Sequence, residues 1–594
     1  MISKKIKFRF KRIVRRKRKD AIEVADNAEV QLEKLFFRRL SRLENVRRFV
    51  FGWISLLVLL VVSVGLQARG LGAYYQKIAP IDGGTLREGV IGTFSNSNPL
   101  YAVTLVDGSV SKLVFSSLFT HDVNNQLLPD LADKWESDEK GQVYKVTLRK
   151  NVKWHDGEPF TARDVVYTYT TIQKPDAKSP LLASWQGVAV KELDEFTVEF
   201  SLPSPLASFP YSLINGIVPY HILADIPASQ LRSVPFNSVK PIGTGPFLWS
   251  SVEVTGTSRD NRNEQIALKK NPRYHLGAPK IDQYVLRTFR DESELVKAYV
   301  NKELTAIVGL DKLPSELATD ESSIGYNIPT DGAVMIFFNN TNPLLQDVKV
   351  RRALASATDT AELIKQLGFT ALTTNGPLLK SHIGYDKAIT QLPFNIIEAE
   401  KLLDEAGWTR TGTDIRQKDG IPLALKFVSQ NVAEYAAISQ VLQKQWRDIG
   451  IDVDVKLKSE EDMQGGILKK HDYDVLLYGI SLGPDPDVFA YWHSSQNDVR
   501  SASRLNLSEY KSKIADTALE AGRTRIEPAL RAVKYKPFLQ AWREDAPAVS
   551  LYQPRFLYIA RGELIGFNAR RLNSSVDRLN NIQTWTVLQD RVLK

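Results

Sequence analysis

The sequence predicts an α/β fold carried behind one membrane-spanning helix, and three observations lead to this prediction. Strand and helix patterns alternate through the chain from residue 83 onward. An apolar stretch of 18 residues without a charge, 49–66, has the length of a transmembrane helix. The basic excess is confined to residues 1–48, which hold 17 Lys and Arg against 6 Asp and Glu.

Length and composition are those of a globular protein with several domains. A chain of 594 residues is too long for one ordinary core, and its 43% apolar and 25% charged residues are typical globular values. Residues 49–594 hold 61 basic and 62 acidic side chains, so the folded part is balanced in charge and we expect no nucleic-acid partner. Because there is no cysteine, disulfides, thiolate metal sites and Cys nucleophiles are excluded.

The apolar stretch predicts an uncleaved signal anchor. Its basic side is the N-terminal one, so the positive-inside rule places residues 1–48 in the cytoplasm and the folded part outside. The alternative is a cleaved signal peptide. That alternative would need a basic n-region of 48 residues, and no pair of small residues marks a cleavage site around 67–69.

The basic tail carries a further helical pattern. Its apolar residues recur at helical spacing with arginines between them: Leu32, Leu35, Phe36, Leu40 and Leu43. This pattern predicts an amphipathic helix on the inner leaflet, whereas a solvated tail that only sets orientation explains the charge equally well.

The first strand–turn–helix unit of the folded part lies at residues 144–164. Apolar and polar residues alternate over 144–149, which is the pattern of a strand with one solvated face. A turn at 155–157 follows. Thr161 and Asp164 then stand in capping-box spacing, which predicts that a helix begins there.

The second half repeats this alternation. We expect helices that begin at Asp347, Asp359, Asn395 and Asn431, where a capping residue precedes an apolar stripe. Gly407 and Gly450 are expected to end two of them. Strands are expected over 451–457 and 474–480, and the alternation predicts mainly parallel sheets covered on both faces.

Four literal motifs carry a family resemblance: Leu-Pro-Asp-Leu-Ala-Asp-Lys-Trp-Glu at 128–136, Leu-Arg-Lys-Asn-Val-Lys-Trp-His-Asp-Gly-Glu-Pro-Phe-Thr-Ala-Arg-Asp-Val at 148–165, Pro-Ile-Gly-Thr-Gly-Pro-Phe at 241–247, and Asp-Val-Lys-Val-Arg-Arg-Ala-Leu at 347–354. They resemble signatures of the extracellular solute-binding proteins of peptide and nickel ABC importers, family 5. Trp135 and Trp154 are expected to pack rather than bind. The glycines of 241–247 are expected to supply backbone angles barred to other residues.

The resemblance implies a periplasmic-binding-protein-like, two-lobed α/β fold with mixed sheets and an extra small domain. Mapped by motif, the chain is expected to divide into a tail (1–48), an anchor (49–66), a linker (67–82), domain I (83–103, 236–331 and 551–594), domain II (104–235) and domain III (332–550).

No pattern of catalysis is present in the sequence. The histidines, at 121, 155, 221, 275, 382, 471 and 493, are scattered without ligand spacing, and we expect them at the surface or hydrogen-bonded in the core. There is no Gly-x-Ser-x-Gly elbow, phosphate loop or dinucleotide fingerprint. We therefore expect no catalytic residue, metal or cofactor, and a binding protein rather than an enzyme.

The candidate ligand site lies in 478–487, where many peptide binders of the family read Trp-x-x-Asp-x-x-Asp-Pro. Here Gly479 and Leu482 stand at the Trp and at the Asp that pairs with the peptide amine. The ligand can lack an amine there, Tyr478 and Asp485 can substitute, or the register can slip. The residues expected to contact ligand are Tyr478, Gly479, Ser481, Leu482, Asp485 and Asn339, of which Asn339 has a structural alternative and Asp485 a turn-forming one.

The resemblance implies a membrane-anchored, extracytoplasmic substrate-binding protein of an ABC importer. It would capture a peptide by lobe closure and deliver it to the permease, acting as a monomer. The alternatives are a non-peptide solute (an oligosaccharide, a nickel complex or a haem complex), a peptide-sensing receptor that signals through the tail, and a surface hydrolase.

Overall fold

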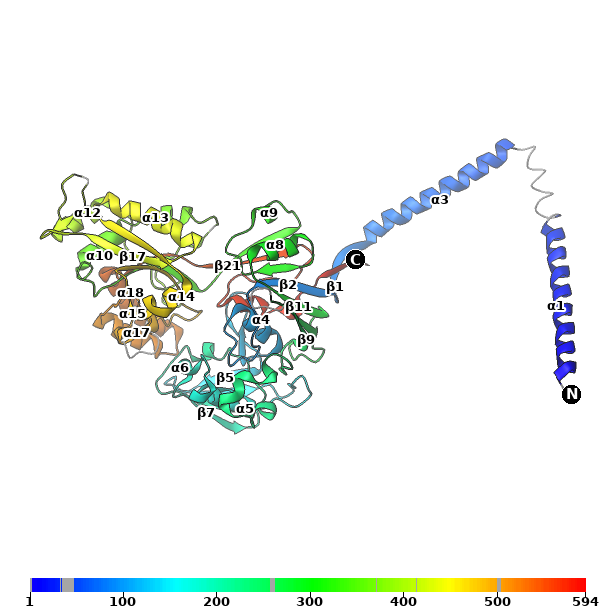
Figure 1. Ribbon diagram of the computed structural model, residues 1–594, viewed down its shortest axis with the longest axis horizontal. Helices are drawn as coiled ribbons and strands as arrows, with labels where there is room; N and C mark the ends of the chain where they lie inside the picture. Colours follow the sequence, from blue (N-terminus) through cyan, green and yellow to red (C-terminus); the bar gives the residue numbers. More distant parts are fainter. Residues whose placement is uncertain are drawn as a thin grey trace. The chain divides into compact units, whose positions relative to one another are not determined.

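The computed structural model (Figure 1) describes residues 3–32, 34, 47–256, 262–369, 371–412, 414–498 and 504–593. The chain divides into two compact units. The first contains Met1–Ala79 and Asp590–Lys594, and the second contains Pro80–Gln589.

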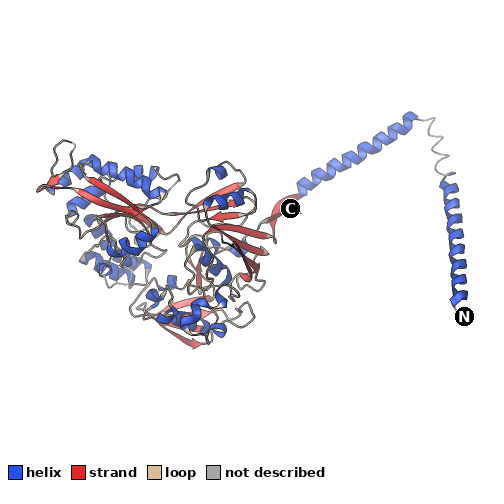
Figure 2. Cartoon of the chain, viewed as in Figure 1, coloured by secondary structure: helices blue, strands red, loops and turns tan. Residues whose placement is uncertain are grey.

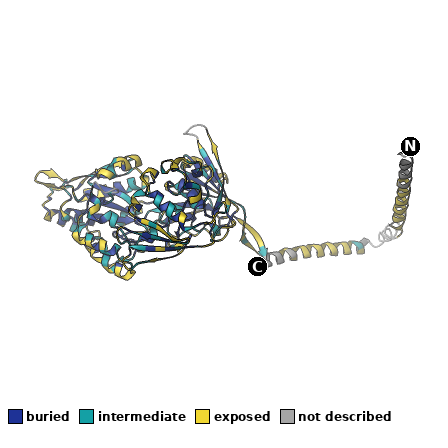
Figure 3. Cartoon of the chain, turned by 90° about the horizontal axis from the view of Figure 1, so that it is seen from below, coloured by how far each residue is buried: buried dark blue, intermediate teal, exposed yellow. Residues whose placement is uncertain are grey.

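The first unit is built from two long helices and a strand pair. They are α1 (Ser3–Leu32), α3 (Arg47–Tyr75) and most of the paired strands β1 (Gln76–Ile81) and β22 (Leu588–Leu593), whose residues 80–81 and 588–589 belong to the second unit. The window Phe49–Gln67 of α3 is long and apolar enough to cross a membrane, and its side chains are exposed (Figure 3). The predicted linker, 67–82, holds the end of α3 and β1. Residues 33 and 35–43 of the predicted amphipathic helix lie outside the described part of the chain.

A seven-stranded mixed sheet forms one core of the second unit (Figure 2). β2 pairs in parallel with β11 and β12, and the other neighbours are antiparallel. α4 (Leu105–Val114) and α8 (Glu292–Val300) pack against the sheet. The strand order is β13 (Ser323–Pro329), β21 (Arg555–Arg561), β12 (Ala306–Val308), β2 (Thr85–Ile91), β11 (Gln283–Phe289), β10 (Asn263–Lys270) and β9 (Phe247–Thr255).

The strand of the predicted strand–turn–helix unit belongs to a four-stranded antiparallel sheet. Its order is β5 (Ala132–Ser137), β6 (Val143–Leu148), β8 (Thr197–Ser201) and β7 (Ala189–Asp194), with β3 (Phe119–His121) and β4 (Leu127–Pro129) as a separate hairpin. β6 confirms the predicted strand. Thr161 and Asp164 form the predicted capping box of α5 (Ala162–Ile172). Trp154 is buried and packs against Phe160, as expected.

A five-stranded sheet forms the other core, in the order β18 (Asp452–Lys458), β17 (Ala424–Gln430), β19 (Val475–Ser481), β14 (Gly332–Phe338) and β20 (Ala548–Tyr552). Alternate residues of β14 enter two separate hydrophobic cores, so the sheet is covered on both faces, as predicted. One core contains α10 (Val348–Ser356), α12 (Ile396–Glu405) and α13 (Ala433–Asp448), and the other contains α17 (Lys513–Arg523) and α18 (Pro528–Asp545).

The prediction of mainly parallel strands is wrong. Only β17 with β18 and β19, and β2 with β11 and β12, are parallel among the described strand pairs. The remaining strands enter each sheet from distant parts of the chain or through hairpins, so alternation with helices does not set their direction. The strands of the three large sheets lie within the ranges expected for domains I, II and III, except that β20 extends to Tyr552. The boundaries themselves stay a prediction.

Most predicted helix starts are confirmed. Asp347, Asp359 and Asn395 cap α10, α11 (Thr360–Lys365) and α12 with their side chains. The expected start at Asn431 is wrong by one residue, because Val432 is the N-cap of α13 and the backbone N–H of Asn431 donates to Lys458 of β18. The Asn431 N–H, which a capping box would use, is therefore hydrogen-bonded to the neighbouring strand β18.

The two most distinctive motifs meet in space. His155 accepts a hydrogen bond at Nδ1 from the Gly243 N–H (3.2 Å), and its Nε2 lies 3.1 Å from the Gly245 carbonyl. The expected reason for these glycines is wrong, since neither has a positive φ. A Cβ at Gly243 would instead lie 1.9 Å from the Val114 carbonyl oxygen. The motif is glycine-rich because the turn contacts the end of α4.

Two segments cross between the seven-stranded and five-stranded sheets. One joins β13 to β14 at residues 330–331, and the other joins β20 to β21 at residues 553–554. They are hydrogen-bonded to each other, because the Thr330 N–H donates to the Pro554 carbonyl (2.9 Å) and Gln553 Nε2 donates to the Thr330 carbonyl (3.1 Å).

Candidate functional site

β19 has an unpaired edge where it approaches the crossing segments. It pairs with β14 over its whole length, from Val475 to Ser481. On its other side it pairs with β17 only at Val475, Leu476 and Leu477. Among the described strands, none pairs with residues 478–481 on that side. The backbone groups of residues 478–480 that face away from β14 are therefore available to an added strand.

The two faces of this edge carry polar groups. Gln464 Nε2 donates to the Tyr478 hydroxyl (3.0 Å) on one face. On the other, a Cβ at Gly479 would lie 2.9 Å from the Tyr435 hydroxyl, so the missing side chain lets Tyr435 approach the strand. Sequence reasoning missed Tyr435 and Gln464, because only the folded chain brings them to β19. A single sequence carries no signal for them.

The residues after β19 are held by the crossing segment. The N–H groups of Leu482 and Gly483 both donate to the Asp331 carbonyl, at 2.9 and 3.0 Å. Leu482 itself is buried in an apolar core, whereas Ser481 is exposed and its carbonyl accepts from the Tyr491 hydroxyl (2.6 Å). An apolar side chain at position 482 thus packs inward.

Asp485 forms a buried ion pair. Its two carboxylate oxygens each lie 2.7 Å from a terminal nitrogen of Arg531 on α18, and one also accepts from the Asp487 N–H at 3.0 Å. The two side chains are 8% and 4% exposed. This geometry matches the turn-forming alternative, and ligand contact by Asp485 stays a prediction.

Asn339 lies apart from the other candidates. It follows the end of β14 that pairs with Val475, whereas the open edge lies toward Ser481, roughly 20 Å along the strand at about 3.3 Å per residue. Its Nδ2 donates to the Tyr473 carbonyl (3.0 Å) and its Oδ1 accepts from the Thr341 hydroxyl (2.7 Å). These contacts fit the structural alternative, while ligand binding by Asn339 stays untested.

Two partly desolvated carboxylates lie near the crossing segments. Burial raises the pKa of Asp331 to about 6, although Arg571, 3.0 Å away, opposes this shift, as does a hydrogen bond from Asn125. Burial also raises the pKa of Glu434, whose carboxylate accepts a hydrogen bond from the Tyr552 hydroxyl. Asp331 has a cationic partner, and Glu434 has none within ion-pair distance among the described residues.

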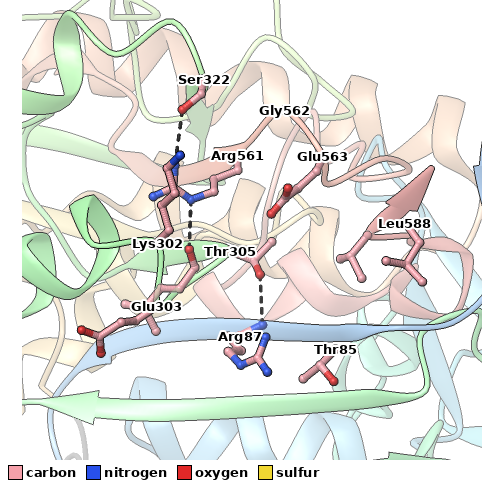
Figure 4. Close-up of a pocket in the computed structure, with 12 residues that line it drawn as sticks. Thr85, Arg87, Lys302, Glu303, Thr305, Ser322, Arg561, Gly562, Glu563 and Leu588 are labelled. Atoms are coloured by element: carbon pink, nitrogen blue, oxygen red, sulfur yellow. Dashed lines mark hydrogen bonds between the residues drawn. The ribbon is translucent and has the colours of Figure 1, made fainter. Parts of the chain in front are cut away.

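A separate cavity of about 550 Å³ lies at the seven-stranded sheet (Figure 4). None of its lining residues belongs to β19 or to the crossing segments. Two of its five charged side chains are engaged in contacts with neighbouring segments: Arg561 donates to the Leu304 carbonyl (3.2 Å) and to the Ser322 hydroxyl (3.3 Å), and Glu303 pairs with Arg287 (2.9 Å). These contacts hold neighbouring loops, so we assign the cavity no ligand.

Three of the histidines form hydrogen bonds inside the folded part. His382 Nε2 lies 2.8 Å from the Gly483 carbonyl, His471 bonds Glu509 at 2.6 Å, and His275 bonds Asp130 at 2.7 Å. Within the described residues, no group of three or more His, Asp or Glu side chains is placed to hold a metal ion.

The sequence also matches a known family profile over residues 126–501, that of the bacterial extracellular solute-binding proteins, family 5. The chain belongs to this family. It is 28% identical over 552 residues to the oligopeptide-binding protein AppA of Bacillus subtilis, covering 90% of this chain and 98% of that protein. Members of family 5 are substrate-binding proteins of ABC transporters, so this chain is a binding protein and not an enzyme.

Two solved family 5 structures share the fold. The AppA structure from Bacillus subtilis, in complex with a nonapeptide, matches with a TM-score of 0.67 and 25% identity over 86% of this chain and 100% of that one. NikZ from Campylobacter jejuni, in complex with Ni(L-His), matches with a TM-score of 0.70 and 27% identity over 84% of this chain and 99% of that one. Both confirm the predicted two-lobed binding-protein fold.

Proposed function

We propose that this family 5 protein captures extended peptides by adding them to the open edge of β19, holds them by lobe closure and delivers them to an ABC permease. The observation that carries the proposal is that β17 ends its pairing at Leu477, four residues before β19 ends. An extended peptide satisfies such an edge through main-chain hydrogen bonds, which are independent of side-chain sequence. The nonapeptide complex of AppA supports this class of ligand.

Lobe closure is supported by the two crossing segments. They connect the seven-stranded sheet to the five-stranded sheet that carries β19, and hinges of this kind absorb the rotation of one lobe against the other. A ligand that contacts both lobes binds the closed state more tightly and shifts the equilibrium toward it. Delivery to a permease follows the transport role of the family, and we propose that the protein acts as a monomer.

The anchor forms the third part of the proposal. None of the apolar side chains of Phe49–Gln67 is buried within the described chain, and a bilayer is the environment in which such a helix is stable. A nickel complex is the alternative ligand, because NikZ shares the fold with Ni(L-His) bound. We favour peptide, because AppA of Bacillus subtilis, which matches 90% of this chain, is an oligopeptide-binding protein.

The test uses the full chain in detergent and a library of random peptides of three to nine residues, with binding followed by native mass spectrometry. We expect intact peptides in the complexes, and X-ray scattering should show a more compact particle when peptide is bound. Nickel with L-histidine serves as the comparison ligand. Recovery of cleaved peptides, or binding of the nickel complex alone, would overturn the proposal.

Main-chain recognition has its own matched control. Two versions of one bound peptide are N-methylated at neighbouring residues, since successive N–H groups of a strand point to opposite sides. Only the N–H that faces β19 is needed for pairing, so one methylation should weaken binding at least about tenfold and the other should have little effect. Equal effects of both methyl groups would argue against strand addition.

A further inference from the structure

Glu434 is a half-buried carboxylate without a cationic partner. It lies in the first turn of α13, which follows β17 in the chain. The hydroxyl of Tyr552 donates to its Oε1, and no ion pair involves Glu434 among the described residues. A carboxylate that is partly removed from water without a compensating charge is costly, as the raised pKa of Glu434 reflects.

The strand register places Tyr552, the hydrogen-bond partner of this carboxylate, in the same row of the sheet as Gly479 of β19, with β14 between them. Tyr552 of β20 pairs with Val334 of β14, which in turn pairs with Gly479 of β19, so the three residues form one row across the sheet. Directly opposed residues of antiparallel strands point to the same face. The Tyr435 hydroxyl lies over Gly479, and Glu434 is its neighbour in α13.

Three acidic groups of the crossing segment and of the turn after β19 are already paired. Asp331 pairs with Arg571 at 3.0 Å, Asp485 with Arg531 at 2.7 Å, and Asp487 with Arg523 at 3.2 Å. These three pairs are complete without a ligand, so they leave no charge for a bound cation to neutralise.

Arg555 is the arginine that influences Glu434, but it is engaged elsewhere. Its guanidinium donates to the Asn327 side chain and to the Asp311 carbonyl (2.6 Å), and it stacks on Phe369 at 3.9 Å from the ring centre. It lowers the pKa of Glu434 from a distance, less than burial raises it.

We propose that Glu434, together with the hydroxyl of Tyr435, binds a primary ammonium group of the ligand, while the buried Tyr552 hydroxyl holds the carboxylate in place. The ammonium has three donors and one positive charge, which suit a carboxylate and a neighbouring hydroxyl oxygen. The group is either the α-amino group of a peptide or the side chain of one of its lysines. This inference rests on the proposed peptide-binding function and names the residue that selects a cationic ligand.

The experiment measures the affinity of the full chain in detergent for one library peptide that it retains, by calorimetry. Four forms of this peptide are compared: unmodified, N-acetylated, acetylated at a lysine side chain, and acetylated at both. Glu434→Gln keeps an oxygen for the Tyr552 hydroxyl and removes the charge. We expect Glu434→Gln to weaken the unmodified peptide by about tenfold to a hundredfold, the range of a charge-assisted hydrogen bond.

The decisive result is a double-mutant cycle. For the ammonium that Glu434 binds, acetylation and Glu434→Gln should not add, because either change removes the same interaction. The control is Glu460→Gln. Glu460 is an exposed glutamate near Tyr478 of β19, and its substitution should leave all four affinities within about twofold.

The outcomes separate this inference from the proposed function. If wild type binds peptides and Glu434→Gln weakens all four forms equally, or acetylation and substitution add fully, Glu434 does not bind the ammonium and peptide capture still stands. If wild type retains no peptide at all, the proposed function fails and this inference fails with it.

Discussion

A histidine whose two ring nitrogens both contact backbone groups is fixed in one protonation state. In His382, Nδ1 accepts from the Leu379 N–H (3.3 Å), so the proton must lie on Nε2, which faces the Gly483 carbonyl. Burial lowers the pKa of His382 to about 4, against the smaller opposing effect of that carbonyl. His155 is held by Gly243 and Gly245 in the same way, and burial lowers its pKa to about 4.

These histidines make stability depend on pH. Between about pH 6.5 and 4, His382 binds a proton in the unfolded chain but stays neutral in the native protein. The free energy of unfolding therefore falls as the pH falls through this range. The loss reaches roughly 3 kcal/mol per residue at the lower pH. In His382→Gln we expect a shallower dependence over this range, measured by urea unfolding of the full chain at several pH values. An unchanged slope would show that His382 titrates normally in the native state.

At the residue scale, the sequence singled out the segment 478–487, and ligand binding by this segment stays a prediction. The substitutions at Gly479 and Leu482 are visible in the sequence as a missing charge, and the segment 478–482 indeed forms the open edge and the turn after it. Tyr435 and Glu434 could not be predicted, because only the fold brings Tyr435 close to Gly479 and Glu434 close to Tyr552. Asp485, readable as a nearby carboxylate, is already paired with Arg531.

At the element scale, capping residues and alternation predicted local structure well, and long-range pairing was beyond them. The capping box of α5 and the caps of α10 and α12 depend on residues three positions apart or fewer, which any sequence displays. The direction of β14 and β20 depends on partners more than a hundred residues away, so the expected parallel order failed.

Close contact between a turn and a helix gives a prediction at the same scale. Gly243→Ala would place a Cβ 1.9 Å from the Val114 carbonyl oxygen at the end of α4, which only a backbone shift can relieve. We expect a loss of about 2–4 kcal/mol in unfolding free energy, measured by urea denaturation followed by tryptophan fluorescence.

The matched control is Gly376→Ala, because a Cβ there meets nothing within 4 Å and the residue has no positive φ. Its unfolding free energy should stay within about 0.5 kcal/mol of the original. Equal stability of the two variants would contradict the steric account of the Gly243 turn.

At the scale of the whole molecule, the absence of native cysteine allows a clean test of topology. Asn27 of the tail and Ser204 of the folded part are both exposed. We expect a membrane-impermeant maleimide to label Ser204→Cys in intact spheroplasts, and to label Asn27→Cys only after permeabilisation, because the basic side of an anchor stays inside. Labelling of Asn27→Cys in intact spheroplasts would refute the proposed orientation. Absence of the segment that carries position 27 from the mature protein would indicate cleavage.

The hydrogen bonds between the two crossing segments have a mechanical consequence. Thr330, Gln553 and Pro554 bind the segments to each other, so neither can slide along its neighbour without breaking them. Twisting the pair leaves these bonds intact, and Pro554 has a fixed φ that further limits bending. We therefore expect the proposed lobe closure to twist the two segments together rather than to slide one along the other, so that peptides of different sequence are enclosed along the same path.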